Sequence, residues 1–306
     1  SFDAGLHRLD PASGQFTHYS HARNDPTSLG DNAVSVVFED SAQRLWAGHD
    51  SGLSLFDRNT GMFQTYTRDS ARASSLAENT VRSLFEDRNG LLWVGYDNNG
   101  ASRWNSRSWA LGHRIPDWLP EPSMINAFAD AGAGNLWMGT SAGVFLHEKN
   151  GRVTKMAESQ ALGDAIVMSL LRDRNDQLWI GTFSSGLFLR SADGGVRRFT
   201  ANSGTEQGLG ADGIMALYED STGRIWIGTF EGGITVYDPK TGQLRRYLDL
   251  NGETPWLGKV RAGIIREDNL GRMWIGTYGD GLLVIAPDEG LLHQFSHDPN
   301  QPGTLS

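Results

Sequence analysis

The feature that most constrains this chain is a short phrase that occurs six times along its 306 residues. The phrase consists of an apolar residue, tryptophan, one further residue and glycine, and a threonine follows in the last four copies. Its tryptophans are Trp46, Trp93, Trp137, Trp179, Trp226 and Trp274, at successive intervals of 47, 44, 42, 47 and 48 residues. So regular a period is typical of repeat architectures, in which each copy forms one structural unit.

Each repeat predicts four short strands. In the fifth copy, an apolar segment at 214–220 ends in an acidic pair, and a tight turn leads into the tryptophan strand. A third strand at 233–238 turns through Pro239 and Gly242, a pairing typical of hairpins, into a fourth strand. No segment keeps a helical period. Four antiparallel strands in about 45 residues describe one blade of an all-β propeller.

The two ends of the chain predict an incomplete blade. Residues 1–20 match the third and fourth strands of a repeat, and residues 296–305 parallel residues 20–29. We therefore expect six complete blades plus the outer half of a seventh, with six-bladed closure as the alternative. The chain is expected to be a piece of a longer one and to form a single propeller domain. Its parts are the outer half-blade 1–20, the complete blades 30–70, 77–112, 122–157, 164–200, 211–250 and 259–297, and the start of the next interblade loop at 298–306.

Composition excludes several classes of function. The formal net charge is −9, which argues against nucleic acid as a partner because phosphates need a basic surface. The chain contains no cysteine, so disulfides, cysteine-ligated zinc and thiol catalysis are excluded. No apolar run approaches the roughly 18 residues of a membrane span, and we expect no direct membrane insertion by this segment.

Motifs that resemble catalytic signatures fall within the repeat. The G-x-S-x-G at 139–143 is the third copy of the phrase, and the G-x-G-x-x-G at 208–213 precedes a strand instead of opening a helix. The acidic pair of each repeat stands just before a turn, where an aspartate can accept hydrogen bonds from turn amides. His293 and His297 lack a third ligand. We therefore predict no catalytic residue, no metal site and no cofactor.

The phrase E-D-x-x-G-x-L-W-I-G-T-x-x-G-G-L, clearest at 219–233, resembles the two-component regulator propeller family. Departures at Ala47, His49 and Tyr96, and an extra turn residue within 129–135, affect local turns only. The resemblance implies the sensor part of a membrane-anchored hybrid histidine kinase or diguanylate cyclase, located in the periplasm or otherwise outside the cytoplasm. It also implies a second propeller, a membrane-coupled output module, and a ligand that is often a glycan. The family motif is structural and supplies no ligand-contact residues.

Ligand contacts are expected where the tryptophan strand ends, on the side where the interblade loops also lie. Exposed aromatic rings beside carboxylates suit a neutral polyhydroxylated ligand, because rings stack and carboxylates accept hydroxyl protons. The side chains at this place are Asp50, Asp97, Asn98, Phe183, Phe230, Glu231, Tyr278 and Asp280. Arg82 and Arg261, in or beside first strands, are the candidates for binding an anionic group.

Four tryptophans lie outside the repeated phrase. Trp104 and Trp109 fall at strand positions that other repeats fill with core aromatics, so both are expected in the core. Trp118 and Trp256 lie in interblade loops and are candidates for stacking on a sugar or anchoring a protein, with covering a blade edge as the alternative. A propeller enzyme acting on glycans, as a lyase or hydrolase, and a protein-interaction scaffold remain alternatives to the sensor.

Overall fold

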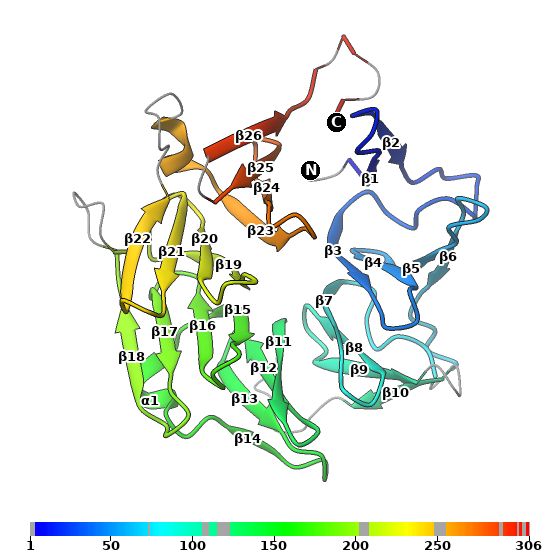
Figure 1. Ribbon diagram of the computed structural model, residues 1–306. Coiled ribbons are helices and arrows are strands. Elements are labelled where there is room, and N and C mark those ends of the chain that lie inside the picture. Colours follow the sequence, from blue (N-terminus) through cyan, green and yellow to red (C-terminus); the bar gives the residue numbers. More distant parts are fainter. Residues whose placement is uncertain are drawn as a thin grey trace. The chain divides into compact units, whose positions relative to one another are not determined.

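The computed structural model describes residues 4–72, 74–105, 110–114, 123–201, 208–247, 255–287, 290–298, 300–301 and 304–305. Within these residues the strands form six four-stranded antiparallel sheets and one two-stranded sheet (Figure 1). Among the described residues, helical structure is limited to α1 (Ser159–Leu162) and the 3₁₀ helix η1 (Pro255–Lys259). The prediction of an all-β fold made of four-stranded propeller blades is confirmed. The chain divides into two compact units, residues 1–155 and 156–306.

The first unit holds a two-stranded sheet and three blades. The two-stranded sheet pairs β1 (Leu6–Leu9) with β2 (Phe16–Tyr19). The strands of the three blades are β3 (Val34–Glu39), β4 (Leu45–His49), β5 (Gly52–Phe56) and β6 (Phe63–Tyr66); β7 (Val81–Glu86), β8 (Leu91–Tyr96), β9 (Ala101–Asn105) and β10 (Ala110–Arg114); and β11 (Ile125–Gly132), β12 (Asn135–Thr140), β13 (Gly143–His147) and β14 (Val153–Lys155).

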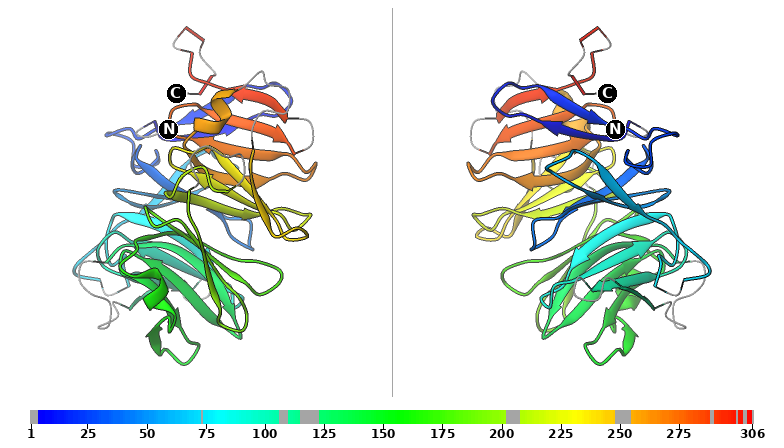
Figure 2. Two further views of the ribbon diagram at one scale, coloured as in Figure 1. Left: turned by 90° about the vertical axis from the view of Figure 1, so that its left-hand side faces the viewer. Right: turned by 90° about the vertical axis from the view of Figure 1, so that its right-hand side faces the viewer.

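The second unit holds the other three blades. Their first strands lie side by side, and their fourth strands form the opposite edge of each sheet (Figures 1 and 2). The strands are β15 (Val167–Arg172), β16 (Leu178–Thr182), β17 (Leu187–Arg190) and β18 (Val196–Phe199); β19 (Ile214–Glu219), β20 (Ile225–Thr229), β21 (Ile234–Asp238) and β22 (Gln243–Tyr247); and β23 (Ala262–Glu267), β24 (Met273–Thr277), β25 (Leu282–Ala286) and β26 (Gly290–Phe295).

The two-stranded sheet packs on the first blade as an outer half-blade would. The ring of Tyr19 on β2 meets Phe56 and Phe63 edge-on, with centroids 5.0 and 5.7 Å apart. The similarity between the two chain ends extends to one contact. His21 Nδ1 lies 2.9 Å from the carbonyl oxygen of Leu29, and His297 Nδ1 lies 2.7 Å from the carbonyl oxygen of Leu305, in each case eight residues further along the chain. Closure into six or seven blade positions, and the single propeller domain, stay predictions.

Five of the six repeat tryptophans are anchored by an aspartate six residues before them in the chain. Trp226 is fully buried, and its Nε1–H donates to Asp220 Oδ2 over 2.8 Å. Asp220 Oδ1 accepts the turn amides of Thr222 and Arg224, each over 2.9 Å. One carboxylate therefore fixes both the turn and the indole of its blade. The same indole bond joins Trp46 to Asp40, Trp93 to Asp87, Trp179 to Asp173 and Trp274 to Asp268, over 2.8 to 2.9 Å.

The environment of Asp40, Asp220 and Asp268 favours their ionised form. Burial alone would raise the pKa of Asp268, but hydrogen bonds from the Trp274 indole and from Arg272 outweigh it and hold that pKa at about 2. Burial and the corresponding bonds act in the same way on Asp40 and Asp220, and the pKa of each lies below its usual value. The prediction that these aspartates are structural acceptors is confirmed.

The glutamates of three acidic pairs, Glu86, Glu219 and Glu267, each join their blade to the blade before it. Glu267 on β23 accepts the backbone N–H and the hydroxyl of Ser221, in the turn of the preceding blade, over 2.7 and 2.6 Å. Glu86 binds Ser41 in the same way, over 2.6 and 2.7 Å. These carboxylates therefore link neighbouring sheets at the end of the blades where the first strand turns into the second.

The glycine after each tryptophan allows the blades to approach closely. A Cβ on Gly48 would lie 2.5 Å from a side-chain carbon of Val81 on the next blade. A Cβ on Gly228 would lie 2.6 Å from the carbonyl oxygen of Ala262, again on the next blade. Carbon atoms do not approach that closely, so a side chain here would push the sheets apart.

The predicted core tryptophan of the second blade is also confirmed. Trp104 is 5% exposed, and its ring centroid lies 5.1 Å from that of Trp46 on the neighbouring blade. Trp109 lies outside the described residues.

A histidine replaces the repeat's threonine in the first blade. Elsewhere, as at Thr229, the hydroxyl bonds within the following turn. His49 is fully buried, its Nε2 lies 2.8 Å from Ser54 Oγ, and its Nδ1 accepts the Ser51 amide over 3.3 Å. The ring is therefore neutral with its proton on Nε2. Burial lowers the pKa of His49 to about 4.

We predict that Asp220→Asn destabilises the protein by about 2 kcal/mol, because an amide cannot accept from the indole and the turn amides at once. Urea denaturation followed by tryptophan fluorescence measures the change. Asp193→Asn is the control: this exposed aspartate also accepts a turn amide, from Gly195, but contacts no tryptophan, and the unfolding midpoint should hardly move. Equal effects of the two substitutions would contradict the anchoring role.

We also predict a pH dependence that originates at His49. Between pH 6.5 and 4 the unfolded chain binds a proton at this residue and the folded chain does not, so the free energy of unfolding falls as pH falls. The loss attributable to His49 between pH 7 and 4.5 is about 2 kcal/mol. Denaturation of the protein and of His49→Gln at both pH values tests this, because the variant should lose correspondingly less stability on acidification. Identical losses would show that His49 does not contribute.

Candidate ligand-binding site

In each blade a short connection joins the second strand to the third. One position of this connection makes a conserved backbone hydrogen bond, but its side chain differs from blade to blade. The N–H of Phe230 donates to the carbonyl just before its own first strand, Gly213 O, over 2.8 Å. Phe183 and Tyr278 make the equivalent bond over 2.9 Å, and Asp97 makes it over 3.2 Å. Because the fold uses only the backbone here, the side chain is free to serve another purpose.

This position differs between the two units. In the first unit it holds the polar residues Asp50, Asp97 and Ser141. In the second unit it holds Phe183, Phe230 and Tyr278. Three consecutive blades of the second unit therefore present aromatic rings at the same end of their sheets.

The aromatic residues of the second unit, together with Arg261, form what we call the aromatic cluster. Phe183 is 51% exposed and Phe230 is 36% exposed, which is high for phenylalanine. The ring centroids of Phe230 and Tyr278 lie 6.5 Å apart, and Arg261 Cζ lies 5.9 Å from the Phe230 centroid. Within the described residues Arg261 forms no ion pair, so its charge is uncompensated. The structure thus brings these four sequence-predicted residues to one end of one unit.

A β-bulge in the first strand of each described blade shapes this end of the sheets, and no feature of the sequence predicted it. The register of first and second strands shifts by one residue at the same place in all six blades. In the second unit the bulged residues are Met168, Met215 and Gly263. A Cβ on Gly263 would lie 2.6 Å from Tyr278 Cε2, so the absence of a side chain gives the Tyr278 ring its place. Bulges commonly re-aim side chains beside functional sites.

The other predicted residues of the second unit are less clearly placed for binding. Glu231 is exposed. The backbone of Asp280 is held by Thr277 Oγ1 and Gln294 Nε2, each over 3.0 Å. Trp256 lies on η1 and packs, partly buried, against the core of its unit, which accords with the alternative of covering a blade edge.

The first unit gathers polar and charged groups at the corresponding positions. Arg82, on the bulge of β7, lies 2.9 Å from Asp97 and 3.5 Å from Asp50 on the preceding blade. Asn98 bonds through its backbone and side chain to Glu78, over 2.9 and 3.3 Å. Two carboxylates therefore balance the charge of Arg82, and it is less suited than Arg261 to bind an anion. Trp118 lies outside the described residues.

The chemistry available at the aromatic cluster is that of binding. Exposed rings can stack on the face of a sugar or another flat ligand, and the unpaired guanidinium can pair with a carboxylate. In the part of the chain that the structure describes, no three histidine, aspartate or glutamate side chains are grouped to hold a metal ion. Neither helical segment among the described residues is long and apolar enough to cross a membrane.

Comparison with known protein families confirms the origin of the repeat. Three segments, residues 75–98, 161–184 and 208–231, match the model of the two-component regulator propeller family. Each segment ends just beyond the tryptophan strand, and together they cover blades of both units. The chain therefore carries two-component regulator propeller repeats. No curated protein matches the sequence.

Solved structures similar to this chain include an extracellular domain of a two-component system, a bacterial surface protein and an enzyme. The extracellular domain of the proposed hybrid two-component system BT3049 from B. thetaiotaomicron aligns with a TM-score of 0.54 and 17% identity over 97% of this chain. The chain spans 56% of that domain. PorZ, a surface component of the type-IX secretion system of Porphyromonas gingivalis, aligns at 0.69 and 18% identity, over 92% of this chain and 44% of PorZ.

The enzyme is virginiamycin B lyase from Staphylococcus aureus, whose complex with quinupristin aligns at 0.67 and 11% identity over 90% of this chain and 87% of the lyase. At these identities all three structures are evidence for the propeller fold alone.

Proposed function

We propose that this chain is the non-enzymatic, ligand-binding propeller of an extracytoplasmic sensor that belongs to a membrane-anchored two-component protein. The family of its repeats supports this, as does the fold it shares with the extracellular domain of BT3049. A second propeller and a membrane-coupled output module belong to the same proposal.

The observation that carries the binding role is the aromatic cluster. Most carboxylates of the repeated acidic pairs are engaged in an indole, turn or interblade hydrogen bond, and Glu39 pairs with Arg58 of its own blade. By contrast, Phe183, Phe230 and Tyr278 stand at a repeat position that holds polar residues in the first unit, and the ring centroids of Phe230 and Tyr278 lie 6.5 Å apart. Exposed aromatic side chains that the fold does not require mark an interaction site.

We propose a glycan or another small ring-bearing molecule as the ligand. Ring stacking supplies affinity without demanding a charge, and Arg261 adds selectivity for ligands that carry a carboxylate. The polar residues of the first unit, Asp50, Asp97 and Asn98, are of the kind that accept and donate hydrogen bonds with hydroxyl groups.

We predict that a thermal-shift screen with neutral and uronic-acid-containing oligosaccharides identifies a ligand whose binding depends on the aromatic cluster. Phe230→Ala and Tyr278→Ala should each weaken binding roughly fivefold, about 1 kcal/mol, by removing one stacking surface. Arg261→Gln should weaken binding only of ligands with a carboxylate. Isothermal titration calorimetry measures each affinity.

Leu270→Ala is the matched control for these variants. Leu270 is 70% exposed and lies in the β23–β24 turn, at the opposite end of the blade from Tyr278. Its replacement should leave ligand affinity unchanged. A ligand that binds equally well to all four variants would show that the binding site lies elsewhere.

A further inference from the structure

One face of the last blade of the second unit has no neighbouring sheet among the described residues of that unit. On the other face, β23 packs against the blade before it, and Ile265 and Met273 share a buried cluster with Trp226. Side chains of a strand alternate between the two faces of a sheet, so the residues next to Ile265 and Met273 belong to the opposite face. These are Ile264, Trp274 and Gly276, and we call them, together with Asn269 in the β23–β24 turn, the open face.

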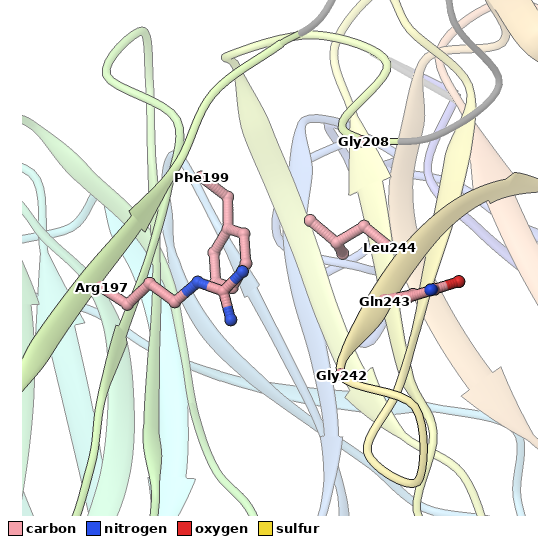
Figure 3. Close-up of a pocket in the computed structure, with 6 residues that line it drawn as sticks. All are labelled: Arg197, Phe199, Gly208, Gly242, Gln243 and Leu244. Atoms are coloured by element: carbon pink, nitrogen blue, oxygen red, sulfur yellow. The ribbon is translucent and has the colours of Figure 1, made fainter.

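Figure 3 shows how the equivalent face of an earlier blade is covered. Phe199 on β18 stacks on Trp179 of its own sheet, with ring centroids 6.2 Å apart. The Leu244 side chain, on β22 of the next blade, points toward the Phe199 ring, and all three residues are buried in one cluster. A groove of about 290 Å³ remains between these strands and is also lined by Arg197, Gly208, Gly242 and Gln243.

The open face carries the same aromatic stack with less cover. Trp274 and Phe295 stack with ring centroids 6.3 Å apart, as Trp179 and Phe199 do. Trp179 and Trp226 are fully buried, whereas Trp274 is half-buried. The last blade therefore has the aromatic residues of a covered face without the complete burial that the next blade provides elsewhere in this unit.

The exposure of Ile264 is the clearest sign of the missing cover. Ile264 is 46% exposed, and the residues at its position in the two preceding blades, Ser169 and Ala216, are 8% and 7% exposed. Ala216 lies in one buried cluster with Ala262 and Ile265 of the following blade. An exposed apolar side chain at a position that the next sheet otherwise covers indicates a contact surface.

The glycine of this blade also lacks the neighbour that requires it. A Cβ on Gly228 would lie 2.6 Å from the carbonyl oxygen of Ala262 on the following blade. Among the described residues, a Cβ on Gly276 would meet only Ile264 of its own sheet. The repeat therefore leaves room on the open face for the close approach of another strand.

The turn of this blade lacks the hydrogen bond that links the earlier blades. In the two preceding blades the N–H of Arg174 or Ser221 donates to a glutamate of the following blade, Glu219 or Glu267, over 3.0 and 2.7 Å. Asn269 occupies the same place in the last blade, and within the described residues its N–H has no protein acceptor. A glutamate at the end of an approaching first strand would supply one.

The outer half-blade of the first unit lacks the same kind of strands. In the part of the chain that the structure describes, β1 pairs only with β2, whereas the third strand of each four-stranded blade is hydrogen-bonded on both sides. Leu6 and Leu9 on β1 are half-buried, and their counterparts Leu53 and Phe56 on β5 are buried. A first strand and a tryptophan strand would complete this sheet.

We propose that the open face is a docking site for the inner strand pair of a further propeller repeat. This pair consists of an apolar first strand that ends in glutamate, a tight turn, and a tryptophan strand. The first strand covers Ile264 and Gly276, and its glutamate accepts the Asn269 N–H. Continuity with the interfaces between the preceding blades favours this occupant, because each feature of the open face is one that such a strand pair covers there. The site does not depend on the aromatic cluster or on the proposed sensing role.

Extension of the chain tests the proposal. A copy of residues 211–230, which carry β19, β20 and their turn, is joined after Ser306. We expect the thermal unfolding midpoint to rise by about 5 °C or more above that of the unextended protein, because the added strands bury the open face. An extension with the same residues in shuffled order is the control and should give no rise.

Two substitutions connect the rise to the open face. Ile264→Lys should hardly change the midpoint of the unextended protein, because the side chain is exposed, but should remove most of the rise, because the added strands would bury a charge. Alanine at the copy's counterpart of Glu219 should remove part of the rise, because Asn269 loses its acceptor.

Three results would overturn the proposal. They are no rise with the extension, an equal rise with the shuffled extension, and a rise that Ile264→Lys leaves intact. Sedimentation that shows the unextended protein to be a dimer, dissociated by Ile264→Lys, would assign the open face to a second copy of this chain and would also overturn it.

Discussion

The hydrogen bond between an indole and an aspartate is the interaction on which five of the six described blades depend. A tryptophan brings a large apolar surface into the sheet, but its N–H must find an acceptor when water is excluded. Asp220 supplies that acceptor and at the same time satisfies the amides of the turn that precedes the tryptophan strand. The strand, the turn and the core are thereby fixed by one side chain, which explains why aspartate and tryptophan recur together at a spacing of six residues.

A few repeated residues also make the contacts between neighbouring blades. Glycine at positions such as Gly228 lets the next sheet approach, and glutamates such as Glu267 hold the turn of the sheet before. Because these repeated residues hold the blades together, the connection after the tryptophan strand contributes to the fold through its backbone hydrogen bond. That freedom accounts for acidic side chains at this position in two blades of one unit and aromatic side chains in the other.

The sequence was sufficient to predict the blades because period, turn residues and alternation all repeat. It also placed Phe183, Phe230 and Tyr278 correctly at one phase of the repeat. It could not show that Asp50 and Asp97 neutralise Arg82, because the three side chains come from two blades and meet only when the sheets stack. The bulge was equally invisible, since a shift of one residue leaves the alternating pattern almost unchanged.

The glycine that follows each tryptophan has a consequence for how such a protein changes over time. Any side chain at Gly48 or Gly228 would wedge adjacent blades apart, so this residue keeps neighbouring sheets close to one another. Modules with a common spacing are interchangeable: one can be duplicated, lost or replaced without re-fitting its neighbours. Recognition can then diversify blade by blade through exposed connections, while the scaffold that carries them stays the same.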